Sequence, residues 1–462
     1  MFCRGCFQEF GLQVMDETQL RERLIRVGMS VPQAEMKARL FDRAARALPV
    51  SSGADEFLSY SYVPGRIEFL GKHTDYAGGR SLICTLERGF CVVSSARNDP
   101  TIRITDVGRN ESIQFNLSSD LVPIAGHWSN YPMTVASRVA RNFPGARRGA
   151  DIAFASDLPP AAGLSSSSAL VVAIFCALER INDISAMDEY RENIKSTEDL
   201  AGYLGTVENG LSFGSLASGK GVGTFGGSQD HTAILCCKSG QLSQYSFCPV
   251  RHERTIDLPA DLSFVIGVCG ISAAKTGDAL EKYNRVSRLA SEALAVWNSA
   301  TGRVDATLMA AATSSSDASS RMRKELEGSS SSVFSPSELA GRFEQCWIES
   351  TEIIPAVAQA LSVGHADRIG IEIDRSQRNA ERFLGNQVPE TISLARTARE
   401  LGAIAASAFG AGFGGSVWAM VSASDAERFK EAWAERYWST FPDLKGNSQF
   451  FVTGTGPAMG VL

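Results

Sequence analysis

A loop rich in glycine and serine is the part of this sequence best suited to chemistry. In residues 158–173, LPPAAGLSSSSALVVA, proline and apolar residues lead into Gly163, four serines follow, and an apolar run continues to Leu178. The first N–H groups of a helix have no partner within the helix, and the helix dipole favours an anion there. Small side chains let the backbone wrap around phosphate oxygens, and a serine hydroxyl can also reach a magnesium ion. Two interpretations stay open here: a phosphate-binding loop, or a serine-rich turn that caps a core helix.

A second polar cluster, PGRIEFLGKHTDYAGG at residues 64–79, could bind hydroxyl groups. It brings together five polar side chains within ten residues: Arg66, Glu68, Lys72, His73 and Asp75. A His-x-Asp pair beside glycines offers both donors and acceptors to a ligand with several hydroxyl groups. A solvated loop could have the same composition, so this interpretation depends on the rest of the chain.

Two more glycine-rich clusters lie further along the chain. GTFGGSQDHTAIL, at residues 223–235, places Asp230 between a glycine turn and an apolar run, where an aspartate is either catalytic or a helix cap. ASAFGAGFGGSVWAM, at residues 406–420, permits close approach of the backbone to a ligand, and a glycine-rich hairpin is the alternative. Each cluster is weak evidence when it stands alone.

The surrounding pattern predicts helices and strands in mixed order. Apolar residues spaced by three and four predict helices up to about residue 50, and short strand-like runs follow between residues 57 and 158. Helices are expected at 133–141, 169–181, 187–204 and 277–298, with a strand near 261–270. Residues 313–338 are rich in serine, and we expect a mobile surface connection there. More helices follow, with strands at 416–421 and 449–455, so the pattern indicates α/β or α+β layers, of which we expect α+β.

Length and composition indicate a soluble globular enzyme with two domains or with one large domain that carries insertions. The chain has 462 residues, which is too long for one compact core, and its net charge of −6 argues against a nucleic-acid-binding protein. No apolar run approaches the roughly 20 residues that a membrane helix needs, and no secretory signal is visible. Ten irregularly spaced cysteines favour reduced thiols in the cytoplasm. Cys3 and Cys6 form a CxxC pair without a second pair nearby, which argues against a zinc site.

Taken together, the clusters resemble one family, the GHMP small-molecule kinases, and within it the galactokinase-like branch. GRIEFLGKHTDYAGG looks like the galactokinase signature, GLSSSSA like the family's ATP loop and GAGFGGS like its third motif, in the family's order. No GxxxxGK[ST] sequence occurs, so the phosphate site is not a P-loop. The resemblance implies a helical extension at 1–50, an N-terminal α/β domain like a ribosomal protein at 51–255, and a ferredoxin-like domain at 256–462.

The resemblance also implies a reaction, in which ATP, with Mg²⁺, phosphorylates the anomeric hydroxyl of galactose or a related sugar. Arg66 would stabilise charge near the transferred phosphoryl group, and Asp230 would accept or orient the hydroxyl proton. Ser167 and Glu208 would hold the metal. Ser166 and Ser168 are alternatives to Ser167 as the metal ligand. Glu208 could instead be an exposed carboxylate on a helix.

Further binding residues are carried over from the family motifs. Those expected at the sugar are Glu68, Lys72, His73, Asp75, Gly227 and Tyr283. Those expected at ATP are Gly163, Leu164, Ser165, Ser166, Ser167, Ser168, Gly412, Gly414, Gly415 and Ser416. The expected partners are a small sugar and ATP, without nucleic acid or membrane, and the expected assembly is a monomer or weak homo-oligomer.

The chain departs from the galactokinase pattern Arg-x-Asn-x-x-Gly-Glu-His-x-Asp-Tyr at two positions. Glu68 stands for the asparagine and Lys72 for the glutamate, which reverses the charge where the sugar's C6 would lie. Lys72 could suit a uronic acid, or it could simply pair with Glu68. A longer segment before Asp230, with ASGKGVG at residues 217–223 as the insertion, leaves the role of Lys220 open.

Other activities fit the same motifs. A kinase for L-arabinose, for galacturonate or for another hexose is the nearest alternative, and a mevalonate-type kinase is a more distant one. A sugar and nucleotide sensor without turnover is an alternative of another class. Sugar-dependent consumption of ATP distinguishes the sensor from the enzymes.

Overall fold

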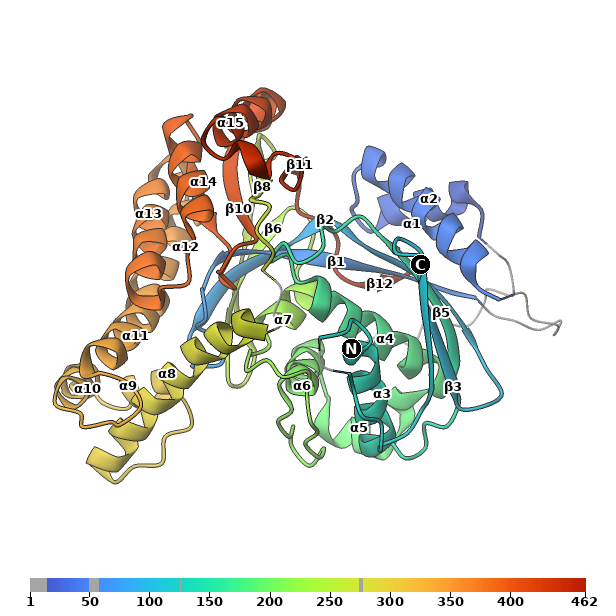
Figure 1. The fold of residues 1–462 in the computed structure, drawn as a ribbon, viewed down its shortest axis with the longest axis horizontal. Coiled ribbons are helices and arrows are strands. Elements are labelled where there is room, and N and C mark those ends of the chain that lie inside the picture. The colour runs from blue at the N-terminus through green and yellow to red at the C-terminus, as the bar shows by residue number, and fades with distance from the viewer. Residues whose placement is uncertain (1–14, 50–57, 125, 274–276) are drawn as a thin grey trace.

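The computed structural model describes residues 15–49, 58–124, 126–273 and 277–462, which form two β-sheets with helices packed around them (Figure 1). The predicted α+β character is therefore confirmed. No helix in this described part of the chain is long and apolar enough to cross a membrane. The cysteines described within it carry free thiols, whereas Cys3 and Cys6 lie outside the described residues.

The larger sheet holds the first sequence cluster. Its strands are β1 (Ser59–Leu70), β2 (Arg80–Ala96), β3 (Thr101–Asp106), β4 (Glu111–Asn116), β5 (Ala150–Ser156), β6 (Gln241–Ser246), β7 (Arg251–Asp257) and β12 (Gly460–Val461). Their order is β12-β1-β2-β5-β3-β4, with β6 joined to β2 and β7 to β6. Only the β3–β5 pair is parallel among these pairings. The last strand thus returns to the first sheet, which the predicted division at residue 255 does not anticipate.

Helices on one face of this sheet contain several of the candidate site residues. They are α3 (Asn130–Asn142), α4 (Ser166–Asn182), α5 (Asp188–Asn193), α6 (Thr197–Asn209) and α7 (Gln229–Cys236). The apolar run of α4 is almost wholly buried against β1 and β2, which fixes the helix that begins at the serine cluster. The helix predicted at 187–204 is two helices, because Ser196 caps α6 by accepting a hydrogen bond from the N–H of Asp199.

The smaller sheet belongs to the second half of the chain. Its antiparallel strands follow the order β11 (Gln449–Thr453), β8 (Leu262–Val268), β10 (Ser416–Ser422) and β9 (Ala405–Ala408). Helices α13 (Gly370–Asn379), α14 (Pro389–Glu400) and α15 (Ala426–Thr440) pack against it. The strand β10 carries Ser416 at its first position, so the third glycine cluster leads directly into this sheet.

The serine-rich segment 313–338 is not a connection without secondary structure. The helices in this region are α8 (Gly277–Thr301), α9 (Leu308–Ala312), α10 (Ala318–Glu327), α11 (Pro336–Ile348) and α12 (Ile354–Ser362). In α10, Ala318, Met322 and Leu326 recur every four residues, are buried, and share a core cluster with Trp297. The sequence prediction is wrong here because small and widely spaced apolar residues supply the buried stripe.

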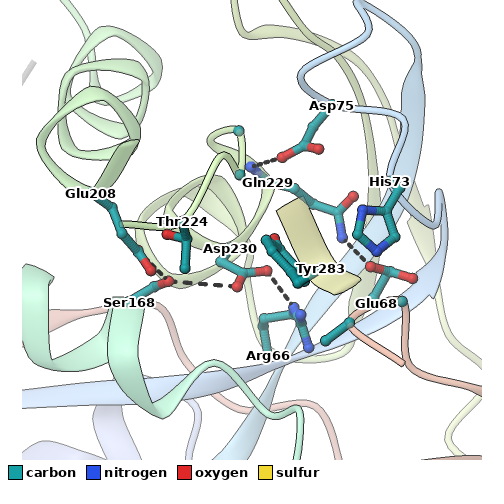
Figure 2. A pocket seen from close by; sticks show the side chains of 14 residues that line it. Arg66, Glu68, His73, Asp75, Ser168, Glu208, Thr224, Gln229, Asp230 and Tyr283 are labelled. Carbon is teal, nitrogen blue, oxygen red and sulfur yellow. Dashed lines mark hydrogen bonds and ion pairs between the residues drawn. The ribbon is translucent and has the colours of Figure 1, made fainter. Parts of the chain in front are cut away.

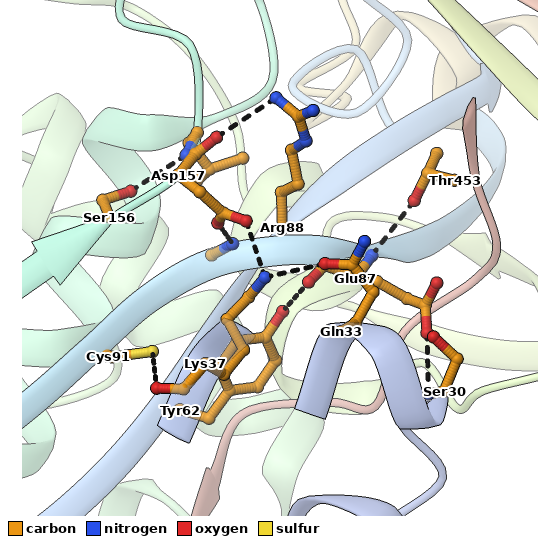
Figure 3. Close-up of polar contacts among 12 residues, drawn as sticks. Ser30, Gln33, Lys37, Tyr62, Glu87, Arg88, Cys91, Ser156, Asp157 and Thr453 are labelled. Atoms are coloured by element: carbon orange, nitrogen blue, oxygen red, sulfur yellow. Dashed lines mark hydrogen bonds and ion pairs between the residues drawn. The ribbon is translucent and has the colours of Figure 1, made fainter. Parts of the chain in front are cut away.

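The described part of the N-terminal extension forms two helices, α1 (Glu17–Arg26) and α2 (Val31–Ala47), that cover the other face of the larger sheet. Lys37 of α2 is wholly buried there, and its ammonium donates to Gln33 Oε1 at 3.0 Å and to Asp157 Oδ2 at 2.6 Å (Figure 3). Asp157 also accepts a hydrogen bond from the N–H of Gly89. Since Asp157 directly precedes the loop at 158–168, the extension anchors the start of that loop.

Candidate active site

Arg66 and Asp230 lie at the centre of a polar cavity between the two halves of the chain. Arg66 comes from β1 and Asp230 from the first turn of α7, and Arg66 Nε donates to Asp230 Oδ1 at 2.7 Å (Figure 2). The cavity is lined by Arg66, Glu68, His73, Asp75, Ser168, Glu208, Thr224, Gly226, Gly227, Gln229, Asp230, Tyr283, Gly410 and Ala411. Four clusters that are distant in the sequence therefore meet at one place.

The serine loop begins α4 next to this pair. Arg66 Nη1 donates to the carbonyl of Gly163 at 2.6 Å, and the N–H of Arg66 donates to the carbonyl of Leu164. Ser165, the N-cap of α4, has a left-handed backbone with φ of 62°, and its side chain makes no capping hydrogen bond. Its hydroxyl is buried without a partner in the part of the chain that the structure describes. A strained residue with an unused hydroxyl is typical of a binding loop rather than of a simple cap.

A large cavity of about 590 Å³ adjoins the polar cavity, with which it shares Arg66, Asp230 and Ala411. Gly163, Ser165, Ser166 and Ser167 form part of its wall. An aromatic wall completes it, with Phe90, His127, Trp128, Tyr131 and Phe154. Flat aromatic side chains beside a loop with free helix N–H groups suit a ligand with a ring at one end and phosphates at the other.

Ser168 differs from its three neighbours because it faces the polar cavity. Its hydroxyl donates to Glu208 Oε2 at 2.8 Å and lies 3.5 Å from Asp230 Oδ2. In Figure 2, Asp230 lies between Arg66 on one side and Ser168 with Glu208 on the other. The ring of His231 is also buried beside Glu208, with Nε2 at 3.2 Å from Oε2. Glu208 is itself buried, so the reading of it as an exposed helix carboxylate is wrong.

The carboxylate Glu68 forms the other end of the polar cavity. Its Oε2 accepts a hydrogen bond from Gln229 Nε2 at 2.7 Å, whereas its buried Oε1 has no hydrogen-bond partner among the described residues. Burial raises the pKa of Glu68, against the opposing effects of the Arg66 and Lys72 charges. Gly410 lies so close that a Cβ there would stand 2.5 Å from Oε2. Glu68 thus lines the cavity with one of its two oxygens left without a partner among the described residues.

Asp75, His73 and Tyr283 complete the polar cavity. Asp75 Oδ2 accepts a hydrogen bond from the N–H of Gln229 at 3.1 Å, and a Cβ on Gly227 would lie 2.4 Å from the same oxygen, so only glycine fits there. Burial raises the pKa of Asp75. The rings of His73 and Tyr283 lie 5.2 Å apart, which places both side chains along one wall.

Lys72 does not line the polar cavity, contrary to the expectation that it contacts the sugar. Its side chain is buried beneath the cavity, where the ammonium donates to Ser407 Oγ at 2.7 Å and to Ser376 Oγ at 3.3 Å. It forms no ion pair with Glu68 within 4.0 Å, so the predicted simple pair is also wrong. The two serines come from the second half of the chain and draw the ammonium away from the cavity.

The third glycine cluster contacts the serine loop at Ala162. Ser416 Oγ donates to the carbonyl of Ala162 at 2.6 Å, and Gly415 packs against the same residue. Gly412, Gly414, Gly415 and Ser416 line neither cavity, nor does Leu164. Gly415 and Ser416 thus contact the loop, whereas Gly412 packs against Asn386 and Gly414 against Ile271.

Sequence reasoning missed several cavity residues. Thr224, Gln229, Gly410 and Ala411 line the polar cavity, and the aromatic wall of the large cavity was not anticipated. The sequence GHWSNYP, at residues 126–132, could have predicted that wall. It places the rings of His127, Trp128 and Tyr131 close together beside an expected helix.

The donor set beside the serine loop suits a hard divalent cation. The Glu208 carboxylate and the hydroxyls of Ser167 and Ser168 are oxygen ligands of the kind that Mg²⁺ prefers. The described residues contain no group of three or more His, Cys, Asp and Glu side chains that could hold a metal. A magnesium ion in such a site takes its remaining ligands from phosphates and water.

Comparison with known proteins places three family models on the chain. The model of the GHMP kinases N terminal domain matches residues 130–214, that of the GHMP kinases C terminal matches 354–439, and the galactokinase galactose-binding signature matches 53–96. These matches include Phe90, Tyr131 and Phe154 of the aromatic wall, together with the serine loop, Glu208 and the cluster around Arg66.

Curated relatives and a solved structure are similar over different lengths. A galactokinase from Actinobacillus pleuropneumoniae is 34% identical over 27% of this chain, which spans only 32% of that relative. A galactokinase from Chloroflexus aurantiacus is 26% identical over 81% of this chain and 86% of its own length. The structure of Lactococcus lactis galactokinase complexed with galactose matches 92% of this chain and 100% of its own, with a TM-score of 0.73 and 19% identity.

Proposed function

We propose that this chain, which belongs to the GHMP kinases and to their galactokinase-like branch, transfers the γ-phosphoryl group of ATP to the anomeric hydroxyl of galactose or a close relative. One observation carries the proposal above all others. The Arg66–Asp230 pair lies where the polar cavity meets the large cavity, and it lines both. A hydroxyl and a terminal phosphate that occupied the two cavities would meet at this pair.

Asp230 is the acceptor for the hydroxyl proton. Its Oδ1 is held by Arg66 and its Oδ2 lies near Ser168, so the carboxylate is fixed on both sides before substrate binds. Phosphoryl transfer needs little covalent help from protein, and positioning with charge neutralisation supplies most of the rate. Arg66 supplies the positive charge for the transferred group, and its hydrogen bond to Gly163 keeps the guanidinium beside the serine loop.

The large cavity holds ATP, with the base against the aromatic wall and the phosphates against the start of α4. Ser165, Ser166 and Ser167 provide hydroxyls there, and the first N–H groups of α4 provide further donors. Glu208, together with Ser167 or Ser168, holds Mg²⁺, which when bound neutralises phosphate charge during transfer. The hydrogen bond from Ser168 orients Glu208 towards that role.

A neutral sugar fits the polar cavity better than a uronic acid. Its carboxylates are Glu68, Asp75, Glu208 and Asp230, and the guanidinium of Arg66 that faces them is already paired with Asp230. Lys72, the residue that could have favoured a uronate, directs its ammonium to Ser376 and Ser407 instead. A sugar carboxylate would therefore meet negative charge without a free basic partner.

A panel of sugars tests the proposal directly. Release of ADP is measured with ATP and Mg²⁺ in the presence of galactose, L-arabinose, galacturonate and no sugar. We expect galactose to give the highest kcat/KM and galacturonate to give the background rate. Turnover with galacturonate alone would overturn the assignment of substrate. Binding of galactose and ATP without turnover of any sugar would favour the non-catalytic sensor.

A further inference from the structure

A small basic pocket lies apart from both cavities, between α3 and the segment that precedes Asp230. It has a volume of about 60 Å³, and the polar residues that matter in it are Thr134, Ser137, Arg138, Arg141 and Lys220. It shares no lining residue with the polar cavity or the large cavity. Lys220 belongs to the insertion at 217–223, so that insertion contributes a charge to this pocket and not to the site at Asp230.

The positive charges of the pocket have no carboxylate partner in the part of the chain that the structure describes. Arg138 is 3% exposed, and its guanidinium donates to Asn142 Oδ1 at 2.7 Å, to Thr206 Oγ1 at 3.2 Å and to the carbonyl of Leu211. All three acceptors are neutral. Within the described ranges, no carboxylate lies within 4.0 Å of the charged nitrogens of Arg138, Arg141 or Lys220, and none lines the pocket. A buried charge in such surroundings is costly unless an opposite charge joins it.

Arg141, like Arg138, donates its hydrogen bonds to neutral acceptors. The two guanidinium nitrogens of Arg141 donate to the carbonyls of Ser218 and Ser119, at 3.1 and 3.3 Å, so this side chain is also held by neutral groups. Burial lowers the pKa of Arg138 against the opposing effect of Tyr203, and the nearby charge of Arg141 also lowers it. The fold therefore holds two like charges in one small pocket, with Arg138 buried and Arg141 exposed.

Two buried polar atoms in the pocket wall are also unused. Arg138 Nη1 and Thr134 Oγ1 have no hydrogen-bond partner among the residues that the structure describes, and their side chains are 3% and 5% exposed. Nη1 lies beside Gly219, where a Cβ would stand 3.5 Å from it, and Gly219 lines the pocket. Buried donors are rarely left without an acceptor in folded proteins.

We propose that the basic pocket binds a phosphate group, either as inorganic phosphate or as the phosphoryl end of a small phosphorylated metabolite. Arg138 supplies a planar donor at the base, Thr134 supplies a hydroxyl, and Arg141 and Lys220 supply charge at the rim. Nε and Nη2 of Arg138 already donate to Asn142, Thr206 and Leu211, whereas Nη1 has no acceptor among the described residues, so Nη1 can donate a charge-assisted hydrogen bond to a phosphate oxygen. The volume suits one such group and not a nucleotide base.

The pocket is connected to the large cavity through one short segment. Gly219, Lys220 and Gly221 line the basic pocket, and the next residue, Val222, lines the large cavity. The carbonyl of Val222 accepts a hydrogen bond from Asn130 Nδ2 at 3.0 Å, and Asn130 lies in the same helix as Thr134 and Arg138. A phosphate that bridges α3 and Lys220 would hold this segment at the wall of the large cavity.

Calorimetric titration with inorganic phosphate tests the proposal in the absence of ATP and sugar. The test variant is the double substitution Arg141→Gln with Lys220→Ala, at two exposed positions that are not expected to disturb folding. The control is Arg147→Gln with Lys195→Ala, which removes the same charge at exposed positions outside the pocket. We expect the wild type and the control to bind phosphate equally, and the test variant to bind about tenfold more weakly or worse.

A second variant, Thr134→Val, keeps the charge and shape of the pocket while it removes the unused hydroxyl, and it too should weaken phosphate binding. Equal phosphate affinity in the wild type, the double variant and Thr134→Val would overturn the proposal, as would the absence of binding to the wild type. Parallel titration with glycerol 3-phosphate distinguishes the source: tighter binding of the ester identifies a metabolite, and tighter binding of inorganic phosphate identifies the free ion. Because no turnover is measured, failure here is separate from failure of the kinase assignment.

Discussion

Arg66 Nε and Asp230 Oδ1 are 2.7 Å apart although 164 residues separate them in the sequence. The strand β1 and the first turn of α7 bring them together, and both side chains are largely withdrawn from solvent, at 5% and 19% exposure. A charge-assisted hydrogen bond of this length fixes the carboxylate and leaves its second oxygen towards Ser168. The proposed chemistry depends on this pair.

Asp230→Asn should remove phosphoryl transfer while it leaves sugar binding largely intact. The amide keeps the shape of the side chain but cannot accept the hydroxyl proton, and loss of a general base lowers the rate by about 10²–10⁴-fold. Steady-state assays of ADP release give kcat, and calorimetry gives the affinity for galactose. Full activity in this variant would refute the role of Asp230, and loss of galactose affinity would indicate a structural role instead.

Ser168→Ala should weaken the response to Mg²⁺ more than the response to sugar. Ser168 holds Glu208 Oε2 at 2.8 Å, and residues that orient a metal ligand typically contribute about 10-fold to 100-fold in metal affinity. The measurement is the Mg²⁺ concentration for half-maximal rate at saturating ATP. Ser167→Ala, in the hydroxyl that faces the large cavity, is the matched comparison. The prediction fails if the Mg²⁺ concentration for half-maximal rate is unchanged in Ser168→Ala but raised in Ser167→Ala. That result would show that Ser167 binds the metal and that Ser168 does not contribute.

Lys37→Met should raise the KM for ATP and leave the KM for sugar unchanged. Lys37 holds Asp157 at the start of the serine loop, and removal of one partner from a buried ion pair costs about 3 kcal/mol. Arg43→Met is the control, because Arg43 lies on the same helix and is exposed. If both KM values rise together, or neither rises, the N-terminal extension does not act through the serine loop.

Much of the fold could be predicted because its elements carry strong local patterns. The strands β1 to β5 and the helix after the serine cluster follow from alternation and from an apolar run. The expected two-domain GHMP kinase fold is confirmed, and the ferredoxin-like form of the second domain stays a prediction. The helix α10 was missed because serines dilute its stripe of Ala318, Met322 and Leu326.

The direction of a long side chain could not be predicted in the same way. Lys72 follows Glu68 by four residues, and spacing alone favoured an ion pair. Its actual partners, Ser376 and Ser407, are more than 300 residues away along the chain and come from the second half of the fold. The position of Ser168 next to Glu208 likewise depends on how α4 and α6 pack, which the serine run does not encode.

Glu68→Gln should stabilise the protein at neutral pH and lose that advantage in acid. Burial raises the pKa of Glu68 above its ordinary value of 4.5, so the folded state binds this proton more tightly than the unfolded state does. Below the ordinary carboxyl pKa, Glu68 is protonated in both states and does not lower the free energy of unfolding. As pH rises through the raised pKa, the buried charge forms and lowers the free energy of unfolding of the wild type. Thermal unfolding from acidic to neutral pH measures the difference in Tm between the variant and the wild type. A difference that does not change with pH would contradict this account.

The same substitution should weaken sugar binding, because Glu68 lines the cavity and its Oε1 has no partner among the described residues. Greater stability together with weaker binding is the trade-off expected of a residue kept for function. Calorimetric titration with galactose measures the loss. Unaltered galactose affinity in Glu68→Gln would show that this end of the cavity does not contact the sugar.

Detection of the product tests the central claim most directly. Galactose, ATP and Mg²⁺ are incubated with the wild type and with Asp230→Asn, and ³¹P NMR follows the phosphorus signals. We expect galactose 1-phosphate and ADP to accumulate in equal amounts with the wild type, and both to form at least about 100-fold more slowly with the variant. Absence of galactose 1-phosphate with the wild type, or equal formation by the two proteins, would contradict the central claim.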